Sequence, residues 1–138
     1  MKVPEAGTEV FAMDVGSSAD PGPTFDAPFP VDWVFKTPPS GSDQRHTSAR
    51  LTQGTYLRLD QTNSDSTDSN FAFDFSDGWG ISWASNIQSW MFKRAPEFFD
   101  VVCYLGNGVA GTTQAHNLGV VPEMMMVKRR TGTAKDWA

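Results

Sequence analysis

The sequence predicts an all-β fold, an antiparallel β-sandwich or barrel with little helix. Short segments of alternating apolar and polar residues recur along the chain, and clusters of turn-forming residues separate them. An alternation of period two turns one face of a strand toward a core. No long stretch has the 3.6-residue period of an amphipathic helix. Many short strands joined by turns rich in Gly, Pro, Asp and Ser are typical of sandwiches and barrels.

The first expected strands lie in the N-terminal half. Glu9–Val15 is a short apolar stretch, and Val31–Lys36 is a compact hydrophobic segment that follows a proline. Thr55–Asp60 is apolar with a polar interruption, and Asn70–Phe75 places three phenylalanines on one face. Aromatic and β-branched residues favour strands.

The later expected strands are Ser89–Lys93, Val101–Leu105 and Glu123–Lys128. Cys103 alternates with Val101 and Leu105, so we expect it in a core. The intervening turn-rich stretches are Gly16–Pro30, Pro38–Ser42, Gln61–Ser69 and Ser76–Gly80.

Length and charge limit the class of protein. A chain of 138 residues suits one domain, or one domain and part of another. A net charge of −5 argues against nucleic acid as a partner, because binding it needs a basic face. No apolar run approaches the roughly 18 residues of a membrane span, so we expect no membrane insertion. A single cysteine excludes an internal disulfide.

Two parts of the chain resemble each other. Pro30 is followed by an apolar run ending at Lys36, and Pro122 is followed by a similar run ending at Lys128, at the same spacing. A β-rich run and a small-residue turn precede each proline. Internal repetition indicates a modular array. We therefore expect an N-terminal extension over residues 1–7, a β-sandwich repeat unit over 8–98, and the opening strands of a second, incomplete unit over 99–138.

A glycine-rich loop follows the strand expected at Val101–Leu105. Gly106, Gly108 and Gly111 have the spacing of a dinucleotide-binding loop. That site also needs a helix after the third glycine and an acidic residue about 20 positions further on, and this sequence supplies neither. We therefore expect no cofactor. Gly106-Asn107-Gly108 is instead predicted to be a tight turn with at least one positive φ.

The stretch from Asp77 to Ala138 resembles a repeat domain found in tail-fibre and other virion structural proteins of marine tailed bacteriophages. The likeness rests on "YLGNG", "AHNLGVVPEM", "VKRR" and "DW", and is weaker over Met1–Ser76. It implies a concanavalin A-like (lectin-type) jelly roll and a virion component. The matched residues to which we assign a structural turn role are Gly106, Asn107, Gly108, His116, Gly119 and Pro122.

We expect a non-enzymatic structural protein of the virion, assembled in the host cytoplasm and acting as a tail-fibre or adhesion module. Its expected partners are further copies of the chain, other virion proteins and a host-surface glycan. One alternative is a protein that decorates the capsid. A less favoured one is a polysaccharide-cleaving tail enzyme, because the E-x-D-x-x-E strand of concanavalin A-like glucanases is missing and Asp74 with Asp77 is a poor substitute.

The candidate glycan platform combines two aromatic rings with polar neighbours. Trp79 and Trp83 lie in a glycine-bounded stretch near Asp77 and Asn86. An exposed ring stacks on the apolar face of a sugar while carboxylates and amides bond its hydroxyls. The alternative is that both tryptophans cap the sandwich core.

No metal site is expected. His116 is interpreted as a turn residue and His46 as a surface residue, since neither has a second ligand at metal-binding spacing. The loop Asp60–Asn70 offers the oxygen ligands that Ca²⁺ prefers, but it lacks the glycine and closing glutamate of an EF-hand. A solvated acidic turn is the favoured interpretation, with Ca²⁺ binding as the alternative.

Overall fold

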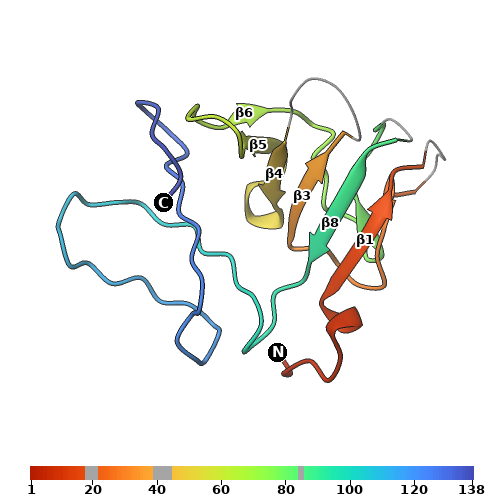
Figure 1. The fold of residues 1–138 in the computed structure, drawn as a ribbon, viewed down its shortest axis with the longest axis horizontal. Coiled ribbons are helices and arrows are strands. Elements are labelled where there is room, and N and C mark those ends of the chain that lie inside the picture. Colours follow the sequence, from red (N-terminus) through yellow and green to blue (C-terminus); the bar gives the residue numbers. More distant parts are fainter. Residues whose placement is uncertain (18–21, 39–44, 84–85) are drawn as a thin grey trace.

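Six strands form the larger sheet of the computed structural model, which describes residues 1–17, 22–38, 45–83 and 86–138 (Figure 1). Every neighbouring pair is antiparallel, and the spatial order is β1-β8-β3-β4-β5-β6. The strands are β1 (Phe11–Val15), β3 (Trp33–Thr37), β4 (His46–Ala49), β5 (Thr55–Arg58), β6 (Ser66–Thr67) and β8 (Gln88–Phe92).

A second layer covers one face of this sheet. It contains the short antiparallel pair β2 (Phe25–Asp26) and β7 (Gly78–Trp79). The helical content of the described residues is limited to two 3-10 turns, η1 (Gly7–Glu9) and η2 (Arg50–Thr52). Neither is long enough to cross a bilayer. The prediction of an all-β antiparallel sandwich with little helix is thus confirmed.

The core lies between the two layers. Val34 of β3 is paired with Met91 of β8, and both side chains are fully buried on the inner face of the larger sheet. From the opposite layer, the Trp79 ring stacks on Phe25 at a centroid distance of 4.9 Å. The buried apolar cluster comprises Phe25, Ala27, Phe29, Val31, Val34, Phe71, Phe73, Trp79 and Met91.

The strand predicted at Asn70–Phe75 does not form, although its burial was foreseen. Phe71 and Phe73 are fully buried, but the segment joins no sheet. Arg50 donates to the carbonyl oxygens of Phe73 and Phe75, and the side chain of Gln53 accepts from the Phe73 N–H at 3.2 Å. Side chains, together with the backbone N–H groups of Gly54 and Gly80, therefore satisfy backbone groups that a neighbouring strand would otherwise bond.

Strand β4 was not predicted, because its sequence is polar. All four of its residues are buried. The Thr47 hydroxyl donates to the Val34 carbonyl at 2.8 Å and the Ser48 hydroxyl to the Thr55 carbonyl at 2.6 Å. The interpretation of His46 as a surface residue was wrong, since only 5% of it is exposed.

Residues 99–138, all of which the structure describes, contain neither strand nor helix. The strands predicted at Val101–Leu105 and Glu123–Lys128 are absent, and Cys103 is exposed rather than in a core. These segments pair with none of the described strands, so their alternation alone does not make a sheet.

The end of this C-terminal segment runs beside β5 and β6 (Figure 1). The Asp65 N–H donates to the Arg130 carbonyl at 2.8 Å, and the Trp137 indole donates to the Arg58 carbonyl at 3.0 Å. Arg130 also pairs with the Asp65 carboxylate at 2.7 Å. The segment is thus tied to the sandwich at its far end, and the domain boundary between residues 98 and 99 stays a prediction.

Candidate functional site

Trp79, the first residue of the predicted glycan platform, is a core residue. Its exposed fraction is 0%. The indole N–H donates to the hydroxyl of Ser89, itself fully buried, at 2.9 Å. A sugar cannot reach this ring, so the interpretation of Trp79 as a platform is corrected in favour of the alternative, a tryptophan of the sandwich core.

Trp83 is half-buried and is already in contact with other groups of the chain. Its indole N–H donates to the Asn70 carbonyl at 3.2 Å, and the amine of Lys36 lies 4.0 Å from the ring centroid. Asp77 and Asn86 are exposed, and no hydrogen bond within the described residues links their side chains to Trp83. The structure therefore brings the two tryptophans together, at 6.3 Å between ring centroids, without assembling the predicted set.

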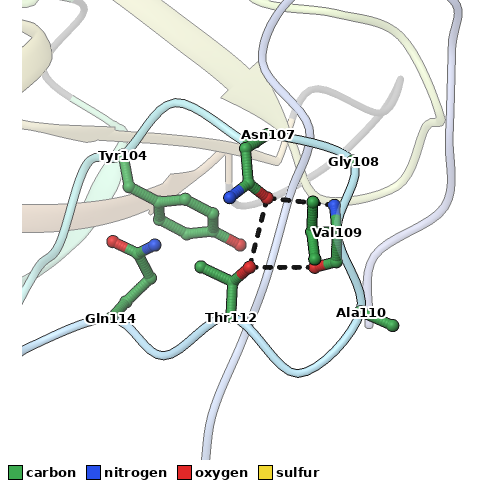
Figure 2. Close-up of a pocket in the computed structure, with 8 residues that line it drawn as sticks. Tyr104, Asn107, Gly108, Val109, Ala110, Thr112 and Gln114 are labelled. Carbon is green, nitrogen blue, oxygen red and sulfur yellow. Dashed lines mark hydrogen bonds between the residues drawn. The ribbon is translucent and has the colours of Figure 1, made fainter.

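The glycine loop closes on itself instead of leading into a helix (Figure 2). The Asn107 side-chain oxygen accepts from the Val109 N–H at 3.0 Å and from the Thr112 hydroxyl at 3.2 Å. Gly108 has a φ of +73°, which meets the expectation of a positive φ within Gly106-Asn107-Gly108. The hollow inside the loop has a volume of about 430 Å³ and is open to solvent, and Tyr104 and Gln114 complete its lining.

The other turn residues lie at the neck of this loop. His116 accepts from the Leu118 N–H at 3.3 Å through its ring Nδ1, a local bond within one turn. Gly119 has a φ of +77°, and Pro122 is half-buried. The Asp100 carboxylate accepts from the Asn117 N–H at 2.7 Å and closes the neck.

The acidic loop Asp60–Asn70 uses its carboxylates within the protein. Asp65 pairs with Arg130, Asp60 lies 3.5 Å from Arg58, and Asp68 accepts from the Asn70 N–H at 2.9 Å. No group of three or more potential metal ligands is found within the described residues. These partners fit the interpretation as an acidic turn better than the Ca²⁺ alternative.

Sequence reasoning missed a polar cluster on the inner face of the larger sheet. Lys36 of β3 is paired with His46 of β4, which in turn is paired with Arg58 of β5. Lys36 is only 3% exposed, and burial lowers its pKa to about 8, although the charge of Asp68 opposes this shift. The available signal was the alternation within Val31–Lys36, which places Lys36 on the same face as the buried Val34.

Lys36→Met is expected to stabilise the fold by on the order of 1–2 kcal/mol at pH 7, because it removes a buried charge and keeps the side-chain volume. In the parent, the unfolded chain binds more protons than the folded chain between pH 8 and 10.5. The free energy of unfolding should therefore rise with pH across this window, and this rise should be lost in the variant. Urea denaturation at pH 7 and 9 measures both effects.

The control is Lys2→Met, which removes the same charge from an exposed side chain and should leave the free energy of unfolding nearly unchanged. A loss of stability in Lys36→Met at pH 7 would contradict the prediction.

The outer face of β1, β8 and β3 carries an apolar surface, here called the outer aromatic face, and Phe98 and Phe99 of the same chain pack on one end of it. The register aligns Phe11, Phe92 and Trp33 in one row and Met13, Trp90 and Phe35 in the next. Met13 is 59% exposed and the aromatic residues are half-buried. The Phe35 and Trp90 rings stack on each other at 4.6 Å, with 15° between their planes. Because these two rings cover each other's faces, the surface suits packing against protein better than stacking on a sugar.

A second apolar surface, here called the methionine stretch, spans residues 120–127. Its sequence is VVPEMMMV. Val121 is 86% exposed, Met124 78% and Met125 73%. Methionine is adaptable and common at binding surfaces. The molecule thus presents two apolar surfaces of different character, one on the sandwich and one on the C-terminal segment.

Comparison of the chain with models of known protein families, with curated proteins and with solved structures yields no match. The resemblance to phage virion repeats therefore stays a prediction.

Proposed function

We propose that this chain is a non-enzymatic structural module of a tailed-phage virion, in a tail fibre or adhesion structure, and that it assembles with further copies and other virion proteins. The observation that carries the assembly role is the pair of apolar surfaces, the outer aromatic face and the methionine stretch. Apolar patches of this kind on a folded domain mark sites of association. The phage context rests on the resemblance of residues 77–138.

The position of β1 supports the same proposal. It is an edge strand whose outward side chains, Phe11, Met13 and Val15, are all apolar. Edge strands of monomeric proteins are usually protected by lysine, proline or a covering segment. An apolar edge beside the outer aromatic face favours association over a monomeric state.

Sedimentation velocity over a range of concentrations tests the assembly. The parent chain is expected to associate. Met13→Lys and Met125→Lys each place a charge on one of the two apolar surfaces, and each is expected to raise the dissociation constant at least tenfold if that surface is buried on association. The reason is that a buried unpaired charge costs more than 1.4 kcal/mol. Leu51→Lys is the matched control, since Leu51 is 48% exposed on η2. A parent that remains monomeric at every concentration would contradict the proposal.

The place of the protein in the virion is tested separately. An antibody against the chain, viewed on phage particles by electron microscopy, should label the fibre, whereas label on the head would favour the capsid-decorating alternative. Turnover of a polysaccharide that is abolished in Asp74→Asn or Asp77→Asn would instead favour the tail enzyme.

Host-glycan binding is a second part of the proposal, and the buried Trp79 is excluded from the residues proposed to bind the glycan. Trp83, half-buried, and the exposed Asp77 and Asn86 are the predicted residues that a ligand could still reach. A glycan array with the parent and with Asp77→Ala and Asn86→Ala tests it. Because both side chains are exposed, the two substitutions are expected to leave the core unchanged.

A further inference from the structure

His46 is buried without the hydrogen bonds that a buried imidazole normally makes. It is 5% exposed, and within the described parts of the chain neither ring nitrogen has a hydrogen-bond partner. Its ring lies against Tyr56 at a centroid distance of 4.3 Å and near Phe71 at 6.0 Å. A neutral imidazole is tolerated in this aromatic setting, but a protonated one would bury a charge with no acceptor.

The neighbours of His46 make protonation still less favourable. The sheet register places Lys36 on one side and Arg58 on the other, so two cationic residues flank the ring on adjacent strands. The acidic residues Asp60 and Asp68 act in the opposite direction but more weakly. The titratable or charged groups that face His46 are Lys36 from β3, Tyr56 and Arg58 from β5, Asp60 after β5 and Asp68 after β6.

Burial lowers the pKa of His46 to about 4, and the charges of Lys36 and Arg58 add to this shift. In the unfolded chain an ordinary histidine has a pKa near 6.5. The unfolded chain therefore binds more protons between pH 6.5 and 4. The contribution of neutral His46 to the free energy of unfolding is therefore fully present above pH 6.5 and is lost as the pH falls from 6.5 to 4.

We propose that His46 is an acid-sensitive contact, whose protonation separates the β4–β5 end of the larger sheet, which includes Tyr56, from the aromatic residues Phe71 and Trp83. At neutral pH the uncharged ring packs against Tyr56 and lies near Phe71. In acid, a third positive charge between Lys36 and Arg58 opens this end of the sandwich. The proposal concerns the β-sandwich alone and is independent of the virion role.

The test compares His46→Phe with the parent. Phenylalanine keeps an aromatic ring against Tyr56 and cannot be protonated. Between pH 7 and pH 4 the unfolding equilibrium constant of the parent should rise on the order of 100-fold more than that of the variant. His116→Phe is the matched control, because it removes the other histidine from an exposed loop and should keep the parent's pH dependence.

An NMR titration of the parent gives an independent measurement if His46→Phe does not fold. The His46 ring signals should titrate near pH 4, together with changes in the ring signals of Tyr56 and Trp83. Equal pH dependence in His46→Phe and the parent, or titration of His46 above pH 6, would overturn the proposal.

Discussion

Trp79→Ala is expected to destabilise the protein by about 3–5 kcal/mol, which for a domain of this size is a large part of its total stability. The indole is fully buried and its ring contacts Phe25, Phe71 and Phe73 at centroid distances of 4.9–5.6 Å. Removing it leaves a cavity between the two layers that close-packed aromatic neighbours cannot fill. Chemical denaturation followed by circular dichroism measures the loss.

Trp79→Phe separates packing from hydrogen bonding. It keeps most of the aromatic contact but leaves the buried Ser89 hydroxyl without its indole partner. The expected cost is about 1–3 kcal/mol, smaller than that of the alanine variant. If Trp79→Ala folded with the stability of the parent, Trp79 would not be the centre of the core.

Gly78→Ala is expected to cost about 3 kcal/mol, at the upper end of the range for overpacking. A Cβ atom at position 78 would lie 2.2 Å from the carbonyl oxygen of Phe25 and 2.8 Å from the ring of Pro23. Residue 78 pairs with Asp26, so the clash falls within the β2–β7 pair and is with backbone, which cannot move aside without losing the pairing. Thermal unfolding of the variant provides the measurement.

Alanine variants of two other glycines separate the effect of the steric clash on stability from the effect of a positive φ. Gly54 has a φ of +77° but open space around its Cα, so Gly54→Ala should cost only about 1–2 kcal/mol of backbone strain. Gly7 has open space and no positive φ, so Gly7→Ala should change stability by less than about 0.5 kcal/mol. Equal effects at all three positions would show that steric contact is not the cause.

Alternation of apolar residues was sufficient to predict the strands that bury one apolar face. The segments Val31–Lys36 and Ser89–Lys93 correspond to β3 and β8 within two residues at each end, and both strands alternate between buried and half-buried positions. Here local pattern and tertiary environment agree, because each strand lies between two others and packs one face on the core.

Prediction was wrong where pairing or burial depends on distant residues. His46–Ala49 is buried although it is polar, because its hydroxyls bond backbone carbonyls of other strands. Conversely, Val101–Leu105 has the composition of a strand but forms no backbone hydrogen bonds with any of the described strands. Whether a segment pairs is decided by its neighbours in space, which the local sequence does not specify.

The same reasoning explains the outcome for the candidate site. Composition identified Trp79 and Trp83 as aromatic residues with polar neighbours in sequence, but exposure is a tertiary property, and Trp79 lies in the core. The cluster of Lys36 and His46 joins residues of two paired strands, β3 and β4, and its importance comes from burial. The outer aromatic face was not foreseen either, because it requires the register of three strands.

The position of β8 between β1 and β3 has a consequence for the order of folding. Both of its neighbours precede it in the chain, and the register joins Phe11 to Phe92 across most of the sandwich. During synthesis, β1 and β3 emerge from the ribosome before β8, the strand that lies between them in the sheet. The β1–β8 pairing requires this long loop to close, and such non-local pairing makes folding slow, on the scale of milliseconds to seconds. Until then, the aromatic rows of the outer face are incomplete and exposed in the nascent chain.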